Sequence, residues 1–264
     1  MKIVAVIPAH MASVRFPRKI LFQFHGLPMI EHVRRRALLS KAFDDVFVAT
    51  CDEEIASAIT SYGGKVIMTA NTHTNGTSRV AEAVKDIDCS HVVLLQGDEP
   101  LMLPSHVNQL VNVIRQSPEI ESWNATGPID HPEELDRHSF VKCAIAESGR
   151  IIFCFRRSPG YSDFEKQQIF IRKILGLIAF RKDFLQKIVA MPVSRIEQFE
   201  FIEQMRVIEN GYSMMSVPVA PSLPSVNEPA EADIVLNYID KEETQLRLLN
   251  AVLLEQFNQE YQKL

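Results

Sequence analysis

The sequence predicts an α/β protein with a mostly parallel β-sheet and helices on both faces, and two observations support this. Short apolar runs that end in turn residues, typical of buried strands, alternate with amphipathic segments typical of helices. The chain of 264 residues, 46% hydrophobic and 23% charged, has the length and composition of one globular domain with a small elaboration. We therefore expect right-handed βαβ units, with ligands bound at the carboxyl ends of the strands.

The first part of the chain alternates regularly. Four β-rich runs are predicted as strands: residues 2–7 (ended by Pro8), 45–49, 65–68 and 91–95. Three segments between them are predicted as helices: residues 29–39, 53–62 and 78–84. The loops that follow the first strand and the strand 91–95 are therefore the places where chemistry is expected.

The remaining chain is less regular. Apolar stretches at residues 141–146, 151–155 and 174–180 predict strands that complete the sheet and form a projecting β flap near residues 120–190. A helix is expected over 196–210, a strand over 213–219, and one or two amphipathic helices after residue 230. We expect a single domain over residues 1–264 whose C-terminal helical extension lies near 240–264.

Charge and cysteine usage exclude several classes of protein. A formal net charge of -5 argues against a nucleic-acid-binding protein, which needs clustered excess cations. The apolar start of the chain is followed at once by charged residues, so neither a signal peptide nor a membrane span is expected. The four cysteines are widely spaced, which predicts reduced thiols in a cytoplasmic protein.

The loop after the first strand contains four potential cations and a hydroxyl group. The potential cations are His10, Arg15, Arg18 and Lys19, and the hydroxyl belongs to Ser13. Backbone N–H groups and Ser13 can bind phosphate oxygens, while Arg15 and Lys19 can neutralise charge as pyrophosphate departs. A solvated basic turn is the alternative, because the loop has neither a P-loop nor a Gly-x-Gly-x-x-Gly pattern.

This loop resembles the signature loop of the 3-deoxy-manno-octulosonate cytidylyltransferases, which reads Ile-Pro-Ala-Arg followed by Ser, Arg, Pro and Lys-x-Leu. The matching positions are Ile7, Pro8, Ala9, Ser13, Arg15, Pro17, Lys19 and Leu21. His10 stands where the family usually has Arg. The resemblance implies nucleotide contacts at Ala9, His10 and Ser13, and catalytic roles for Arg15 and Lys19.

A second motif, residues 73–79, is similar to the family's His-x-Ser-Gly-Thr-Asp-Arg, with Asn75 and Ser78 as departures. The segment precedes a predicted helix, so a simple helix cap also explains it. The resemblance assigns Gly76, Thr77 and Arg79 to the cytidine end of CTP.

A third motif, residues 96–100, reads Gln-Gly-Asp-Glu-Pro, as in the family, and follows the strand 91–95. Asp98 is a candidate ligand for Mg²⁺, which needs only one or two protein carboxylates when phosphates and water supply the rest. The resemblance implies that Gln96 contacts the nucleotide, that Asp98 is catalytic and binds the metal, and that Asn227 takes the place of the family's second metal-binding Asp.

The segments that resemble the family's acid-binding side are less well matched. Arg157, Glu203 and Gln204 are the candidate acid-substrate residues, and Arg157 has the planar fork that suits a carboxylate. Solvated surface charges explain these residues equally well. The family's polar His and Tyr are replaced by Ile174 and Ile178, which predicts a change in acid preference.

The resemblance covers residues 1 to about 239 and implies a nucleotide-diphospho-sugar transferase-like fold, a homodimer formed partly by the flap, and Mg²⁺ as cofactor. The implied reaction joins CMP from CTP to an acidic sugar, 3-deoxy-manno-octulosonate or a related 2-keto-3-deoxy acid, and releases pyrophosphate. Two alternatives stay open: a cytidylyltransferase for a different acid, such as a nonulosonic acid or a phosphonate, and a non-catalytic nucleotide-binding homologue.

Overall fold

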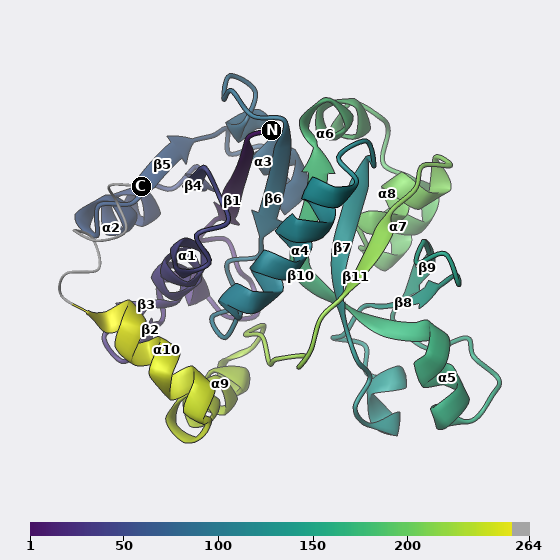
Figure 1. The fold of residues 1–264 in the computed structure, drawn as a ribbon. Coiled ribbons are helices and arrows are strands. Elements are labelled where there is room, and N and C mark those ends of the chain that lie inside the picture. Colours follow the sequence, from purple (N-terminus) through teal and green to yellow (C-terminus); the bar gives the residue numbers. More distant parts are fainter. Residues whose placement is uncertain (255–264) are drawn as a thin grey trace. The chain divides into compact units, whose positions relative to one another are not determined.

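The computed structural model describes residues 1–254 and divides the chain into two compact units. Unit 1 consists of Met1–Asn108 and the segment that begins at Leu223, and unit 2 consists of Gln109–Ser222. Figure 1 labels the elements of both units. The single domain over residues 1–264 stays a prediction, and its last ten residues lie outside the described part of the chain.

Unit 1 is built on parallel strands in the order β6-β1-β4-β5. The strands are β1 (Ile3–Ala9), β4 (Asp45–Thr50), β5 (Lys65–Met68) and β6 (His91–Leu95), and the helices between them are α1 (Met29–Leu39), α2 (Glu53–Ser61) and α3 (Gly76–Ala83). Every residue of β1 is buried, as expected of a central strand covered on both faces.

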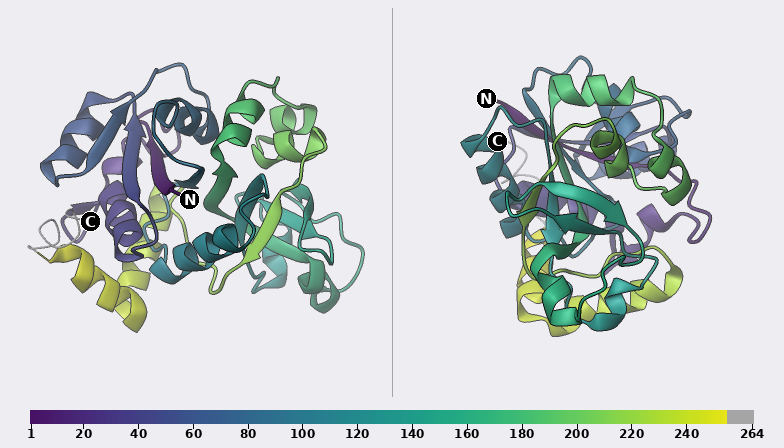
Figure 2. Two further views of the ribbon diagram at one scale, coloured as in Figure 1. Left: turned by 45° about the horizontal axis from the view of Figure 1, so that its top comes forward. Right: turned by 90° about the vertical axis from the view of Figure 1, so that its right-hand side faces the viewer.

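Right-handed crossovers explain where these helices lie. Helices α1 and α2 connect neighbouring strands in one direction across the sheet, so both cover one face. Helix α3 leads from β5 back to β6, and the same handedness places it on the opposite face. The strands of unit 1 can be followed side by side in Figures 1 and 2.

Shorter elements complete unit 1. A 3-10 turn, η1 (Lys19–Leu21), and a hairpin of β2 (Gln23–Phe24) and β3 (Leu27–Pro28) lie between β1 and α1. The C-terminal segment forms α9 (Pro229–Lys241) and α10 (Glu243–Leu253). The expectation of one or two amphipathic helices after residue 230 is confirmed, and within residues 1–254 there are two.

Unit 2 contains β7 (Ser122–Gly127) between parallel β11 (Met215–Pro218) and antiparallel β10 (Ile171–Arg181). A β8 (Lys142–Ile145) and β9 (Ile151–Phe155) pair extends from the first residues of β10, within the region expected to form the flap. Its helical segments are η2 (Pro132–Leu135), α5 (Phe164–Phe170), α6 (Lys182–Val189), α7 (Arg195–Glu200) and α8 (Gln204–Glu209), while α4 (Pro104–Gln116) leads into this unit from unit 1.

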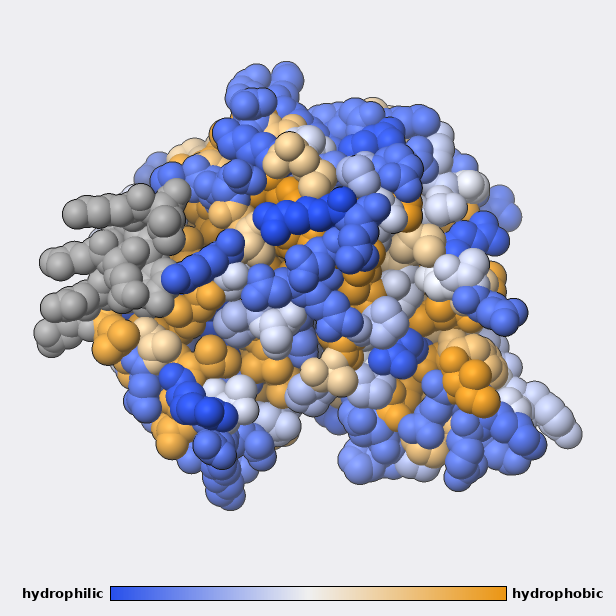
Figure 3. Space-filling model, in the orientation of Figure 1, coloured by the Kyte–Doolittle hydropathy of each residue, from blue (hydrophilic) through white to orange (hydrophobic). Residues whose placement is uncertain are grey.

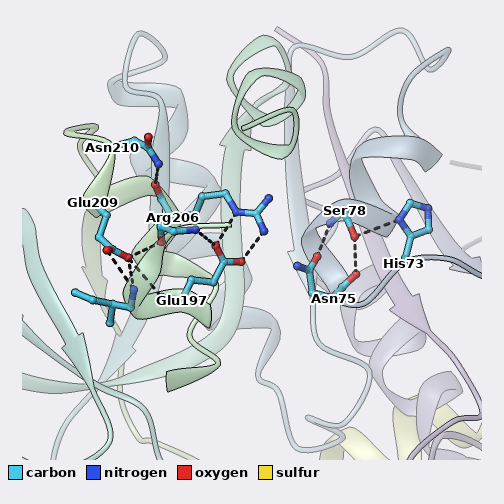
Figure 4. A network of polar contacts seen from close by, with 9 residues as sticks. His73, Asn75, Ser78, Glu197, Arg206, Glu209 and Asn210 are labelled. Carbon is cyan, nitrogen blue, oxygen red and sulfur yellow. Dashed lines mark hydrogen bonds and ion pairs between the residues drawn. The ribbon is translucent and has the colours of Figure 1, made fainter. Parts of the chain in front are cut away.

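The prediction of one helix over residues 196–210 is wrong. The chain turns at Phe201, whose φ of 55° is left-handed, and separates α7 from α8. Arg206 donates two hydrogen bonds to Glu197, and Glu209 accepts from the backbone N–H of Ile196 at the start of α7 (Figure 4). These contacts between the two helices stabilise the turn, which helical periodicity alone does not reveal.

The predicted end of the first strand at Pro8 is also wrong, because β1 continues through Pro8 to Ala9 and pairs with β4 there. Proline is tolerated at this point since the pairing of β1 with β6 has already ended at Val6 and Leu94. Helix α3 begins at Gly76 rather than Ser78, because the Asn75 side chain accepts a hydrogen bond from the Ser78 N–H and caps the helix.

Among the described residues, no helix has the length and apolar character needed to cross a bilayer. The face drawn in Figure 3 carries hydrophilic residues interspersed with smaller hydrophobic patches.

Candidate nucleotide site

A pocket of about 400 Å³ lies in unit 1 where β1, β4 and β6 end and α3 begins. Its position agrees with the rule that ligands of parallel α/β sheets bind outside the carboxyl ends of the strands. Eight residues predicted from the sequence line it: Ala9, His10, Ser13, Lys19, Gly76, Arg79, Gln96 and Asp98. Three motifs that are far apart in the chain therefore form one site.

Lys19 and Asp98 form the central ion pair of this pocket, with 2.7 Å between Nζ and Oδ2. The same ammonium group donates to the backbone carbonyl of Val226 at 3.0 Å, and the Val226 N–H donates to the carbonyl of Asp98 at 2.9 Å. Residues 96–102 form the turn that contains Asp98, called the Asp98 turn below. The first loop, the Asp98 turn and the segment before α9 are thus joined at one point. Both side chains are only partly exposed, so this pair is less screened than a surface ion pair.

The backbone of the Asp98 turn packs closely against the first strand. A Cβ placed on Gly97 would lie 2.6 Å from the side chain of Ile20 and 3.5 Å from the carbonyl of Pro8. Gly76 is similarly tight, because a Cβ there would lie 3.1 Å from the Pro8 ring. These glycines let β1, the Asp98 turn and the start of α3 approach one another.

The start of α3 presents backbone N–H groups and an ordered polar network to the pocket. Asn75 caps the helix, and Ser78 Oγ lies 3.1 Å from the Asn75 carbonyl and 3.2 Å from His73 Nδ1 (Figure 4). His73 Nε2 contacts Glu82, and this hydrogen bond lowers the pKa of the Glu82 carboxyl group. The positive end of the helix dipole favours an anionic or polar ligand.

Two basic residues that line the pocket, Arg79 and His10, differ in charge. Arg79 is buried, and its guanidinium donates to Thr69 Oγ1 at 2.6 Å, so its position is fixed. Partial burial and the nearby Arg79 charge lower the pKa of His10, which keeps its imidazole neutral at pH 7.

Sequence reasoning missed Asp52, which lines the pocket and accepts a hydrogen bond from the Met11 N–H at 2.9 Å. This bond holds the first loop where it leaves β1. The signal was present, since Asp52 follows the end of β4 and carboxyl ends of parallel strands share one edge. Cys51 and Asn71 also line the pocket and were not predicted.

Three predicted residues of unit 1 do not line the pocket. Arg15 is exposed, and its Nη1 lies 3.7 Å from Oε1 of Glu228. Thr77 is the second residue of α3 and does not line the pocket. Asn227 follows Val226, the residue that bonds Asp98 and Lys19, and its side-chain Nδ2 donates to Ser225 at 3.2 Å. Asn227 therefore directly follows the residue that contacts the central ion pair, although its own side chain bonds Ser225 and not Asp98.

The acid-substrate residues predicted in unit 2 do not form one cluster. Arg157 lines a separate pocket of about 520 Å³ together with Phe153, Phe155 and Phe199, and it makes no ion pair within residues 1–254. Gln204 donates to Asn124 Oδ1 at 3.0 Å. Glu203 lies at the start of α8 and does not line the pocket that contains Arg157.

Gln204 is connected to an irregularity of β10. The pairing of β10 with β7 shifts register between Ile174 and Ile178, and Asn124 donates to the Leu175 carbonyl at 2.8 Å within this bulge. Ile178 is buried, with 3% of its surface exposed, so it belongs to the core of unit 2. Bulges are frequent beside functional sites, where they redirect side chains.

The donor set near Asp98 fits a Mg²⁺ ion that takes most of its ligands from phosphate and water. Within residues 1–254, no three His, Cys, Asp or Glu side chains are grouped to hold a metal by themselves. Two carboxylates, those of Asp52 and Asp98, line the pocket, and Asn227 directly follows Val226, whose carbonyl accepts a hydrogen bond from Lys19.

A pocket that combines a helix N-terminus, fixed cations and a carboxylate at the ends of a parallel sheet is typical of nucleotide-binding α/β proteins. The comparison with known families is specific: residues 4–216 match the family described as cytidylyltransferase. The chain belongs to the cytidylyltransferase family.

Two kinds of relative are similar to the chain. The 3-deoxy-manno-octulosonate cytidylyltransferase of Geotalea daltonii is 33% identical, with 89% of this chain and 97% of that protein covered. The 8-amino-3,8-dideoxy-manno-octulosonate cytidylyltransferase of Shewanella putrefaciens is 34% identical, with coverage of 88% and 96%. Overall identity therefore does not separate the two acids.

A solved structure of CMP:2-keto-3-deoxy-manno-octonic acid synthetase in complex with CTP superposes with a TM-score of 0.86 at 33% identity, covering 92% of this chain and all of that one. The α/β fold of nucleotide-diphospho-sugar transferases, predicted from the sequence, is thereby confirmed.

Proposed function

We propose that this protein transfers CMP from CTP to an acidic sugar of the 3-deoxy-manno-octulosonate type and releases pyrophosphate. The observation that carries this proposal is the pocket in which Lys19, Gln96 and Asp98 meet the N-terminus of α3. These groups come from the three motifs that resemble the family. The named relatives act on acids of this type, which supports the assignment.

In the proposed reaction, the anomeric hydroxyl of the acid attacks the α-phosphorus of CTP. The bond from the α-phosphorus to the bridging oxygen breaks, the hydroxyl proton passes to water, and pyrophosphate leaves with the negative charge. Lys19 and Arg15 stabilise this charge, while the α3 N-terminus, Arg79 and Gln96 orient the nucleotide. Mg²⁺, held by Asp98 and Asn227 when bound, would add electrostatic stabilisation of the phosphates.

The Lys19–Asp98 ion pair must open during this reaction. Lys19 cannot donate fully to the phosphates while it is bonded to Asp98 and the Val226 carbonyl. We propose that CTP with Mg²⁺ replaces this pair by contacts between Lys19 and phosphate and between Asp98 and the metal. The pair therefore keeps the two groups in place and mutually neutralised before the nucleotide arrives.

Arg157 is the proposed partner of the substrate carboxylate. It is exposed, forms no ion pair within the described chain, and lies beside aromatic side chains in unit 2. Its fork can bind two carboxylate oxygens. We propose that Glu203 and Gln204 bind hydroxyl groups of the sugar, with Gln204 held by Asn124.

The 8-amino acid is a second candidate substrate, favoured by the relatives from Shewanella. We propose in addition that the protein is a cytoplasmic homodimer. Its four cysteines are free thiols, and unit 2 exposes Phe199, Phe201 and Ile169, side chains that a second subunit could cover. Light scattering after gel filtration measures the oligomeric state.

The decisive experiment measures pyrophosphate release from each of the four nucleoside triphosphates with Mg²⁺, using both octulosonic acids, a nonulosonic acid and a phosphonate. Release with CTP and one octulosonic acid alone is expected. Thermal shift with the same nucleotides tests binding separately, because a ligand that binds only the folded state raises its stability. CTP binding without turnover of any acid would favour a non-catalytic homologue, and equal shifts from all four nucleotides would remove the cytidine assignment.

A further inference from the structure

Helix α10 lies beyond the residues that the cytidylyltransferase family model matches. The relatives are matched over 96–97% of their own length but leave roughly a tenth of this chain unmatched. The family match ends at residue 216, and the motifs can be followed to about residue 239. Within residues 1–254, the helix that follows is α10, Glu243–Leu253.

The buried face of α10 is formed by Gln245, Leu249 and Val252. The spacing of four and three residues places them on one side of the helix. Gln245 is polar but only 2% exposed, and burying an amide is unfavourable unless it is hydrogen-bonded. Its Nε2 donates to the backbone carbonyl of Leu101 at 2.9 Å. A polar residue in an apolar stripe thus makes a specific contact.

Leu101 directly follows the motif that contains Asp98. Its carbonyl also accepts from Arg36 of α1 at 3.4 Å, and the same guanidinium reaches the Met102 carbonyl at 3.4 Å. Arg36 is fully buried without a carboxylate partner in the described residues, and burial lowers its pKa to about 9. The backbone after Asp98 is therefore the principal polar partner of both Arg36 and Gln245.

The far end of α10 is held as well. Arg35 of α1 donates to the carbonyl of Val252, and Val252 is fully buried. Before α10, His25 of the β2–β3 turn lies 2.9 Å from Asp240 of α9. Helices α9 and α10 are thus attached to the rest of unit 1 at separate points, which are the β2–β3 turn, the Leu101 carbonyl and Arg35 of α1.

The same C-terminal segment contacts the Asp98 turn from its other side. The Val226 N–H donates to the Asp98 carbonyl, and α9 begins three residues later at Pro229. Residues 96–102 are consequently held by Val226 near their middle and by Gln245 near their end. Contacts at both points restrict the turn more than either contact alone.

We propose that α10 positions the Asp98 turn, with Gln245 as the positioning residue. The inference rests on the proposed function, in which Asp98 binds the metal. A displacement of about 1 Å in a catalytic group can reduce turnover about a hundredfold, so a hydrogen bond three residues from Asp98 affects the reaction.

Hydrogen exchange of the free protein tests the proposal. Gln245→Met keeps the length of the side chain but removes the donor, and Asn250→Met on the exposed side of α10 is the matched control. The amides of Glu99 and Met102, which donate to Gln96 and Glu99 within the turn, report on its opening. We expect Gln245→Met to speed their exchange about twofold to tenfold, the equivalent of one net hydrogen bond, and Asn250→Met to leave it unchanged.

Two further measurements separate positioning from simple stabilisation. Leu249→Ala removes packing from the same face and should lower the thermal midpoint without selectively exposing the turn. Turnover of Gln245→Met should fall about tenfold at unchanged KM for the acid. Unchanged exchange at Glu99 and Met102, or normal turnover, would overturn the proposal.

Native-state exchange of the unsubstituted protein keeps the test decisive even if Gln245→Met does not fold. The amides of α10 and those of Glu99 and Met102 should then open in one step as denaturant is added. Independent opening of the turn would overturn the proposal. Hydrogen exchange is measured without substrates, so it tests the positioning role of α10 independently of the proposed reaction. The proposed reaction is contradicted only if the unsubstituted protein turns over none of the acids.

Discussion

The pocket of unit 1 and the predicted acid-binding residues of unit 2 differ in how completely their polar groups are assembled. In unit 1, side chains from three motifs meet around the Lys19–Asp98 pair. In unit 2, Arg157 lies among aromatic rings while Gln204 is bonded to Asn124. The comparison indicates that the fold of unit 1 brings its predicted site residues together, whereas those predicted in unit 2 are not grouped in one pocket.

A physical reason for this contrast lies in the ligands. Every cytidylyltransferase binds the same triphosphate, which requires fixed donors and cations, whereas its acid differs from one enzyme to another. Ile174 and Ile178, the positions at which the sequence predicts a change in acid preference, both lie on β10 of unit 2. Variants in the two units should accordingly change different kinetic constants.

The largest effect is expected for Lys19→Met. It removes a charge that stabilises the leaving pyrophosphate, so kcat should fall a hundredfold or more, roughly as for other oxyanion donors. Arg18→Met is the control, because Arg18 belongs to the same loop but pairs with exposed Glu54 outside the pocket. Steady-state pyrophosphate release measures both. Equal activity of the two variants would mean that the loop is only a basic turn.

Arg157→Ala should raise KM for the acid about tenfold to a hundredfold, because a charge-assisted hydrogen bond contributes about 1.5–3 kcal/mol. KM for CTP should stay unchanged, since Arg157 and the nucleotide pocket belong to different units. Arg195→Ala, in the same pocket, is the control. If Arg157→Ala instead changed only KM for CTP, the division of roles between the two units would be wrong.

Restoring the polar residues of β10 should have unequal consequences. Ile178→Tyr places a larger ring at a buried position and should lower the free energy of unfolding by about 1–3 kcal/mol. Ile174 is only partly buried, so Ile174→His should be better tolerated and is the variant in which acid preference can change. Urea denaturation measures stability, and the acid panel measures preference. Similar destabilisation by both variants would contradict this distinction.

A smaller effect is expected for Asn227→Asp. The added carboxylate should lower the Mg²⁺ concentration needed for half-maximal activity several-fold, because Mg²⁺ prefers anionic oxygen ligands. Asn210→Asp, an exposed site in unit 2, controls for net charge. A Mg²⁺ titration of activity and a Mn²⁺ titration of the free protein provide independent measurements. A weaker metal response would indicate that the site is organised around the neutral amide, with the new charge repelling Asp98.

The sequence by itself determined the parallel sheet and the helices of unit 1. It also indicated three parts of the nucleotide site: the first loop, the start of α3 and the turn that contains Asp98. Strand and helix periodicities are local, and motif order fixes which loops share an edge of the sheet. The residues of β6 and α1, for example, were predicted with the bounds that the structure gives.

Only the tertiary structure decided which predicted residues meet. The break at Phe201 depends on Arg206 and Glu209 reaching back to α7, and the role of Asp52 depends on a hydrogen bond to Met11 across 41 residues. The attachment of α10 likewise depends on Gln245 reaching Leu101, 144 residues earlier. Contacts at such separations are set by the packing of the whole unit, so composition, spacing and local propensity cannot specify them.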